Sequence, residues 1–217
     1  MDPKTRLDDE KRSIPPAIKT LLEYDVKITK SFVSFMLNFI AFRSLRTHCK
    51  FLEISCHGIA WIAGWLAYCW VVDNSSLYEM QMNMLFGLFI DIIFVAVLKA
   101  ATRRRRPAFN DDIFCVGPDK FSFPSGHASR AFFILNFFTW LHPVSWFFWP
   151  PMFAWAFSVA FSRLLIYRHH ILDVLAGIVL GTLEGFVLYV LWLGPTTSLW
   201  IMRMISEDNV PGGPEAA

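Results

Sequence analysis

Charged residues are scarce in this sequence of 217 residues. Asp, Glu, Lys and Arg make up 18% of it, whereas they make up about a quarter of an average soluble domain. The chain is instead 55% hydrophobic and 17% aromatic, and its mean hydropathy is +0.42. This balance excludes a disordered chain and an ordinary cytosolic enzyme. The long uncharged stretches also leave no room for two large domains.

Other features are weak or missing as well. The net charge of +2 is too small to indicate nucleic-acid binding. The polar N-terminus MDPKTRLDDEKR lacks the pattern of a cleavable signal peptide. The cysteines have no metal-ligand spacing, so we expect free thiols rather than disulfides; they are Cys49, Cys56, Cys69 and Cys115. The sequence therefore predicts an integral membrane protein.

Five stretches are predicted to cross the membrane, because about 20 apolar residues of helix span the hydrocarbon layer. They are Ile54–Val72, Met80–Leu98, about Gly126–Leu141, about Trp146–Ile166 and Val174–Trp200. The third and fourth form a helical hairpin, because His142-Pro143 divides an uncharged stretch that is too long for one crossing. The predicted fold class is all-α, a multi-pass transmembrane helical bundle of five or six spans.

Three parts are predicted along the chain. Residues 1–50 form a polar N-terminus and an amphipathic helix within Thr20–Phe42 that lies in the membrane interface. A sixth crossing by this segment is the alternative. Residues 51–200 form the transmembrane domain, and residues 201–217 form a disordered tail.

A basic cluster follows the second predicted span. If the helix continues to Arg106, then Lys99, Arg103 and Arg106 share one face, and Pro107 stops the helix. One interpretation is a polybasic stop at the membrane surface. The other is an anion clamp, in which a lysine and a bidentate guanidinium bind a phosphate.

A second polar set, Phe123-Pro124-Ser125-Gly126-His127, stands where the third span begins. The N–H groups at a helix start have no partner within the helix, and the helix dipole favours an anion there. Ser125 adds a hydroxyl donor, and His127 can give or take a proton near neutral pH. The alternative is a serine N-cap followed by an incidental histidine.

A third set contains Ser162, Arg163, His169 and Asp173. Such residues are costly at the end of an apolar helix unless they pair or face water. His169 and Asp173 stand four residues apart, so on a helix the carboxylate can accept from one imidazole nitrogen and orient the ring. An ion-paired loop is the alternative.

The remaining polar positions carry no predicted catalytic role. Asp91 and Glu184 are expected to pair with helix neighbours. Gly177, Gly181 and Gly185 repeat every four residues, a spacing typical of close helix packing. Counting crossings places the three polar sets on one side of the membrane. The pocket that they would form there suits a phosphate carried on a lipid.

The three sets also carry a family resemblance. Lys99-x6-Arg106-Pro107, Pro124-Ser125-Gly126-His127 and Ser162-Arg163-x5-His169-x3-Asp173 resemble, in order and spacing, the three signatures of the type 2 phosphatidic acid phosphatase superfamily. The resemblance covers about residues 50–200. The segment 52–58 and the four consecutive arginines are similar to the polyisoprenoid diphosphate/phosphate phosphohydrolase branch, also called presqualene diphosphatase.

The resemblance implies a role at each matching position. His169 is the expected nucleophile, oriented by Asp173, and His127 protonates the departing lipid oxygen. The expected phosphate-binding residues are Lys99, Arg106, Ser125, Gly126 and Arg163. Positive side chains then supply the charge that magnesium supplies elsewhere, and we expect no metal and no other cofactor.

The resemblance to this branch implies farnesyl, geranylgeranyl or presqualene diphosphate as the substrate. Arg103, Arg104 and Arg105 add positive charge beside Arg106, which also favours a diphosphate. The alternatives are phosphatidate, lysophosphatidate or sphingosine phosphate. A non-catalytic lipid-phosphate binder would not need His127, His169 and Asp173 together. A vanadate-dependent haloperoxidase would be soluble.

The branch implies residence in the endoplasmic reticulum membrane, with the nuclear envelope as the alternative. An excess of Lys and Arg in residues 1–50 predicts a cytosolic N-terminus and a cytosolic site. The family more often faces such sites to the lumen or the exterior, so the side of the membrane stays open. The oligomeric state is open too.

Overall fold

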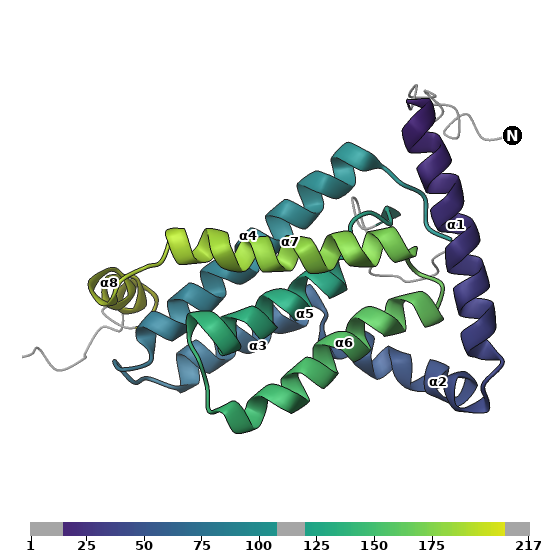
Figure 1. Cartoon of the computed structure of the whole chain (residues 1–217). Helices are drawn as coiled ribbons and strands as arrows, with labels where there is room; N and C mark the ends of the chain where they lie inside the picture. Colours follow the sequence, from purple (N-terminus) through teal and green to yellow (C-terminus); the bar gives the residue numbers. More distant parts are fainter. Residues whose placement is uncertain (1–14, 108–119, 207–217) are drawn as a thin grey trace, which may run out of the picture.

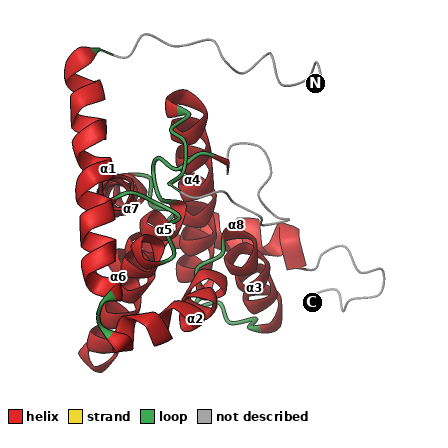
Figure 2. Cartoon of the chain, turned by 90° about the vertical axis from the view of Figure 1, so that its right-hand side faces the viewer, coloured by secondary structure: helices red, strands yellow, loops and turns green. Residues whose placement is uncertain are grey.

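The computed structural model describes residues 15–107 and 120–206, except for the side chains of residues 40–47 and 205–206. All its regular elements over this range are helices (Figure 1, Figure 2). They are α1 (Pro16–Leu37), α2 (Ile40–Ser55), α3 (Gly58–Val71), α4 (Tyr78–Thr102), α5 (Gly126–Asn136), the π-helical turn η3 (Phe137–Leu141), the 3-10 turn η4 (Trp146–Phe148), α6 (Trp149–Leu165), α7 (Ile171–Val190) and α8 (Pro195–Ser206). The predicted all-α class is confirmed for the described residues.

Helix α5 lies at the centre of the bundle, in contact with α4, α6 and α7. Its buried side chains include Ala128, Phe132 and Phe133. Gly177 and Gly181 of α7 let the two backbones approach, because a Cβ atom at Gly177 would lie 2.5 Å from the Ser125 carbonyl oxygen. The predicted close-packing role is confirmed for these two glycines.

The predicted helical hairpin is confirmed. The first arm runs through α5 and η3 and ends at Leu141, just before His142-Pro143. The second arm begins with η4 and α6, and a proline occupies the first turn of α6, where no helical N–H is lost.

The predicted helical face of Lys99, Arg103 and Arg106 is wrong. Helix α4 ends at Thr102, and Arg103 caps it in the left-handed conformation with φ 49°. The chain therefore turns away before Arg106. The exposed Arg103 side chain donates from Nε to the Ala100 carbonyl oxygen at 3.2 Å.

The prediction of one continuous helix over Val174–Trp200 is also wrong. Helix α7 ends at Val190, and α8 starts at Pro195. The Asn83 side chain of α4 holds the turn, because it donates to the Leu193 carbonyl oxygen and accepts from the Leu193 N–H, both at 2.8 Å. Helix α8 continues to Ser206, so residues 201–206 are helical; the rest of the predicted tail lies outside the described residues.

Two of the described helices, α4 and α7, are long and apolar enough to cross a membrane. Residues 48–55 and Gly58–Val71 form a third crossing if they act as one span, although they are bent by 52°. The predicted span Ile54–Val72 is therefore broken near Cys56. Five or six crossings remain a prediction.

Helix α1 covers one end of the bundle and contacts α2, α6 and α7 (Figure 1, Figure 2). It is not among the described helices that are long and apolar enough to cross a membrane. Its buried residues are Asp25, Thr29 and Val33, at helical spacing. An interfacial position for this helix stays a prediction.

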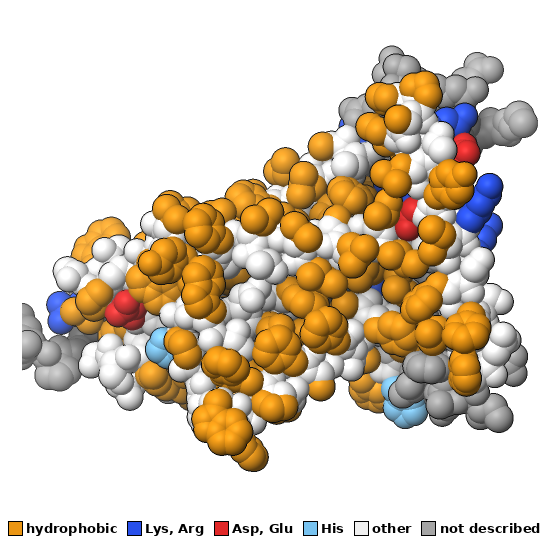
Figure 3. Space-filling view, in the orientation of Figure 1, with side chains coloured by type: hydrophobic (Ala, Val, Ile, Leu, Met, Phe, Trp, Pro, Cys, Tyr) orange, Lys and Arg blue, Asp and Glu red, His pale blue; other side chains and the backbone are white. Residues whose placement is uncertain are grey.

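The outer surface agrees with a membrane environment. The face seen in Figure 3 is mostly hydrophobic, with charged side chains gathered near α1 and near α8. Exposed residues of α7 such as Val179, Leu183 and Phe186 belong to this apolar surface. Cys49, Cys56 and Cys69 form no disulfide, and Cys115 lies outside the described residues.

Candidate active site

The three polar sets meet at one end of the bundle, where backbone hydrogen bonds join them. The Ser122 N–H donates to the Arg104 carbonyl oxygen at 2.8 Å. The Ser125 N–H donates to the Asp173 carbonyl oxygen at 2.9 Å. The segment after α4, the start of α5 and the start of α7 therefore form one framework.

His169 lies in the short connection between α6 and α7 and is 3% exposed. Its Nδ1 is 2.7 Å from the Ser122 carbonyl oxygen. A carbonyl can only accept, so Nδ1 carries the proton and Nε2 keeps its lone pair. The tautomer with a nucleophilic Nε2 follows from this contact.

The charges around His169 favour its neutral form. Burial, together with the positive charges of Arg106, Lys99 and Arg163, lowers the pKa of His169 to about 3, against the opposing effect of Asp173. Three of the predicted phosphate-binding side chains therefore lie close enough to act on this imidazole.

Asp173 does not orient His169 in the way that the helical spacing predicts. His169 precedes α7, and its Nδ1 lies 3.9 Å from Asp173 Oδ2, beyond hydrogen-bond distance. The same oxygen accepts from the His170 backbone N–H at 2.8 Å, as in a capping box. The direct partner of the His169 ring is the backbone of Ser122, which no side-chain motif could have indicated.

Arg163 is 1% exposed and held by three groups. Its Nη1 lies 3.3 Å from Glu53 Oε1, its Nη2 donates to the Cys49 carbonyl oxygen at 3.4 Å, and its Nε donates to Ser162 Oγ at 3.2 Å. Lys99 is also buried, at 4% exposed. Buried cations of this kind favour a bound anion.

The start of α5 fits both interpretations of its sequence, an anion-binding helix N-terminus and a serine N-cap. Ser125 is the N-cap, and its Oγ accepts from the Ala128 N–H at 3.5 Å, so its own hydroxyl can still donate to a ligand. Gly126 is buried, and His127 is half-buried in the first turn. His127 Nε2 lies 3.2 Å from the Glu53 carbonyl oxygen, so α2 also supports this side of the site.

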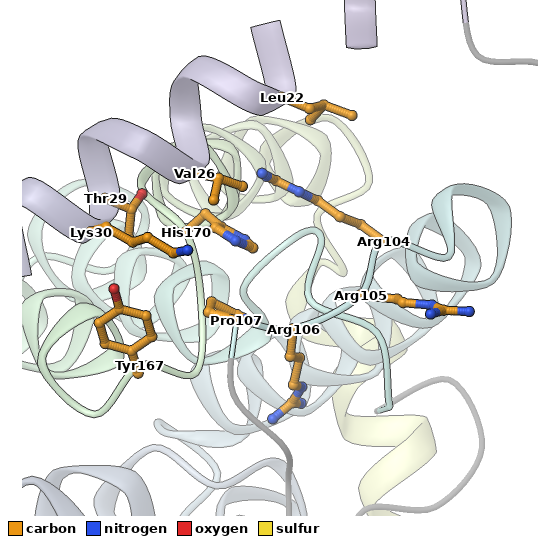
Figure 4. Close-up of a pocket in the computed structure, with 10 residues that line it drawn as sticks. All are labelled: Leu22, Val26, Thr29, Lys30, Arg104, Arg105, Arg106, Pro107, Tyr167 and His170. Atoms are coloured by element: carbon orange, nitrogen blue, oxygen red, sulfur yellow. The ribbon is translucent and has the colours of Figure 1, made fainter. Parts of the chain in front are cut away.

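A cavity of about 380 Å³ lies beside the framework, between α1 and the arginine segment (Figure 4). It is lined by Leu22, Val26, Thr29, Lys30, Arg104, Arg105, Arg106, Pro107, Tyr167 and His170. The consecutive arginines point in different directions: Arg104 points toward α1, and Arg106 points away from it. They do not form one patch around a single phosphate.

Arg104 has a role that the sequence did not reveal. Its two terminal nitrogens bind Asp25 Oδ2 at 2.7 Å and Asp173 Oδ1 at 2.6 Å. The positive charge of Arg104, which was expected to favour a diphosphate, is therefore already paired with the carboxylates of Asp25 and Asp173. Nothing in the sequence singled out Asp25, because α1 also carries Glu23, Lys27 and Lys30.

A second buried ion pair lies deeper in the bundle. Arg130 Nη2 binds Asp91 Oδ2 at 2.6 Å, and Ser129 donates to Glu184 Oε2 at 3.1 Å. The expected pairing of these two acids with helix neighbours is confirmed, although the sequence did not single out Arg130. Among the described side chains, His, Cys, Asp and Glu form no group of three that could hold a metal ion.

Comparisons with known proteins agree with this architecture. The chain is 37% identical over 139 residues to a protein of Arabidopsis thaliana described as probable lipid phosphate phosphatase beta, and the match covers 52% of this chain and 65% of that protein. The structure resembles the crystal structure of the first transmembrane PAP2 type phosphatidylglycerolphosphate phosphatase from Bacillus subtilis. That comparison has a TM-score of 0.58 and 24% identity, and covers 79% of this chain and 86% of the other.

The family model of the PAP2 superfamily matches residues 81–196. This range includes Lys99, His127, His169 and Asp173, so it spans the three sets that meet in the structure. The chain therefore belongs to the PAP2 superfamily.

Proposed function

We propose that this protein is a membrane phosphatase that hydrolyses lipid phosphates through a phosphohistidine at His169, without a metal ion. The observation that carries the proposal is the buried, neutral His169, whose Nδ1 donates to the Ser122 carbonyl oxygen at 2.7 Å. That contact supports the proposal because it leaves the Nε2 lone pair available for attack, in the field of Lys99, Arg106 and Arg163.

The reaction proceeds in two displacements. Nε2 of His169 attacks phosphorus, the P–N bond forms, and the bond from phosphorus to the lipid-side oxygen breaks while His127 gives that oxygen a proton. Water then attacks the phosphohistidine, His127 takes a proton from it, and inorganic phosphate leaves. The cationic side chains stabilise the charge on the phosphoryl oxygens in both transition states, with the Ser125 hydroxyl and the Gly126 N–H as further donors.

For the substrate, we favour polyisoprenoid diphosphates such as farnesyl, geranylgeranyl and presqualene diphosphate, over phosphatidate, lysophosphatidate or sphingosine phosphate. The supporting feature is the 380 Å³ cavity, which contains Lys30, Arg105 and Tyr167 beside Arg106. A second phosphate next to the scissile one would fit such a cationic space. The name of the Arabidopsis relative favours the broader alternative, a lipid phosphate phosphatase.

Competing substrates in mixed detergent micelles test this choice, through the ratio of their kcat/KM values. We expect farnesyl diphosphate to be preferred to phosphatidate and to farnesyl monophosphate. Lys30→Ala should lower kcat/KM for the diphosphate by about tenfold relative to the monophosphate, the effect of about 1.4 kcal/mol. Lys27→Ala is the matched control, since Lys27 is exposed on the same helix and lies over the Tyr24 ring.

A clear preference for phosphatidate would leave the catalytic residues in place and reject the polyisoprenoid substrate. Release of no phosphate from any lipid phosphate would reject the catalytic proposal, and binding without turnover would indicate a lipid-phosphate binder. Residence in the endoplasmic reticulum membrane is part of the same proposal, and a tagged chain imaged with markers of that membrane and of the nuclear envelope tests it.

A further inference from the structure

Helix α1 provides the first hydrogen-bond acceptors for the N-terminus of α7. The Ile171 backbone N–H donates to Thr29 Oγ1 at 3.1 Å. The Leu172 backbone N–H donates to Asp25 Oδ1 at 3.1 Å. The first N–H groups of a helix have no partner within the helix, so both would otherwise be unsatisfied in a partly buried position.

Asp25 also holds Arg104, through its other carboxylate oxygen at 2.7 Å. Arg104 in turn binds Asp173 Oδ1 at 2.6 Å, and its side chain is 11% exposed. One guanidinium thus joins two buried carboxylates, one from α1 and one from α7. Planar guanidinium is suited to this bridge, because its separate N–H groups point at different acceptors.

The bridge ends next to the proposed nucleophile. Asp173 Oδ2 accepts from the His170 N–H at 2.8 Å and lies 3.9 Å from His169 Nδ1. The orientation of the Asp173 carboxylate therefore sets both the start of α7 and the charge that faces the His169 ring. Asp25 does not touch His169 itself: it reaches the ring through Arg104 and Asp173, and it holds the backbone of the same segment at Leu172.

We propose that Asp25 is a positioning residue for this site, and that α1 must be docked on α7 for the site to be competent. The inference rests on the proposed function for its kinetic part. Asp25 lies outside residues 81–196, the segment that matches the family, so this contribution comes from the chain's own N-terminal helix. It adds α1 to the framework built by α4, α5 and α7.

Asp25→Asn tests the proposal, because it removes the charge and keeps the side-chain size. Glu23→Gln is the matched control: an acidic residue two positions away, exposed on the same helix. Arg104→Gln and the variant that carries both substitutions complete a double-mutant cycle. The readouts are kcat, KM and the pH profile for farnesyl diphosphate and phosphatidate, and hydrogen exchange of the peptide that contains residues 169–173.

We expect Asp25→Asn to lower kcat by about 10- to 100-fold with KM little changed, the usual range for a partner that orients a ligand-binding residue. It should shift the pH profile, and Asp25→Ala, which leaves the Leu172 N–H without its acceptor, should speed exchange at residue 172. The loss in the double variant should be smaller than the product of the two single losses, because Asp25 and Arg104 share one bridge. Glu23→Gln should match the wild-type protein in every readout.

Wild-type kcat and an unchanged pH profile in Asp25→Asn would overturn the positioning role. Multiplied losses in the double variant would also contradict it, because they would mean that the two residues act independently. Failure of the proposed function looks different: the wild-type protein and Glu23→Gln would then both lack turnover. In that case unchanged exchange at residue 172 in Asp25→Ala would still reject the docking of α7 by Asp25.

Discussion

His169 is surrounded by groups that keep its imidazole neutral and leave Nε2 with its lone pair. His169→Gln should therefore remove the nucleophile and lower phosphate release by at least about 10³-fold, as expected when a nucleophile is lost. Release of phosphate from micellar lipid phosphate measures this. His142, which lies outside the site in the turn after η3, serves as the control in His142→Gln. Full activity in His169→Gln would reject the assignment.

In the proposed mechanism His127 protonates the departing oxygen rather than attacking phosphorus, so the loss of activity in its variant should differ from that in His169→Gln. His127→Ala should slow turnover by about 10²- to 10⁴-fold, the usual contribution of a general acid and base. Substrates with a better leaving group should recover much of the loss, because they need less protonation. The comparison of a lipid phosphate with an aryl phosphate measures this recovery. Equal losses for both substrates would contradict a proton-donor role.

The low pKa of His169 also predicts how stability depends on pH. Above about pH 6.5 the imidazole is neutral in the folded and the unfolded chain, so it has no effect there. As the pH falls from 6.5 toward 3, the unfolded chain takes up a proton that the folded protein refuses, so stability falls by about 2 kcal/mol between pH 6.5 and pH 5.

Thermal or urea unfolding in detergent measures this slope. His169→Asn should flatten the loss of stability between pH 6.5 and pH 5, because asparagine does not titrate. An identical pH dependence in the variant and the wild-type protein would mean that the folded state also protonates His169 near its ordinary pKa.

At the scale of the helices, the contact between α5 and α7 sets the position of the site. A Cβ atom at Gly181 would collide with the Ser129 carbonyl oxygen and lie 2.9 Å from the Phe133 nitrogen, whereas one at Gly185 would meet only Asn136 Cβ at 3.5 Å. Gly181→Ala should therefore destabilise the protein by about 1–3 kcal/mol, and Gly185→Ala should have little effect. Thermal unfolding in detergent compares the two, and equal melting temperatures would contradict the packing.

The sequence predicted those features of the fold that depend on neighbouring residues. The hairpin break at His142-Pro143 and the glycine contact of α7 follow from local sterics. The end of α4 at Thr102 could not be predicted from local sterics, because Arg103 adopts a left-handed conformation that its residue type rarely takes. The break of α7 before Pro195 depends on the side chain of Asn83, a residue distant in the sequence.

The same distinction applies to the site. The motif residues are recognisable because charges are rare in an apolar chain, so Lys99, Arg163 and His169 stand out. The residues that hold these motif residues in place do not stand out in the sequence. Ser122 acts through its backbone carbonyl, and Asp25 meets Arg104 only after α1 folds across the bundle.

At the scale of the whole molecule, the site lies at one end of an apolar bundle, where a lipid can keep its tail in the bilayer while its phosphate meets the cations. In the proposed mechanism Lys99, Arg106 and Arg163 supply the positive charge, so activity should survive dialysis against EDTA, within about twofold of the untreated protein. The assay is phosphate release from micellar substrate. Loss of turnover with EDTA, and its return on adding magnesium, would contradict the metal-independent mechanism.

The central claim, that His169 carries the phosphoryl group, has one direct measurement. Purified His127→Ala protein is mixed with a lipid phosphate labelled in its terminal phosphate, quenched rapidly in alkali, digested and mapped by mass spectrometry. The account predicts an alkali-stable, acid-labile phosphate on His169, and none in the protein that also carries His169→Gln. Label on another residue, or phosphate release by the His169→Gln protein at the rate of the wild-type protein, would contradict it.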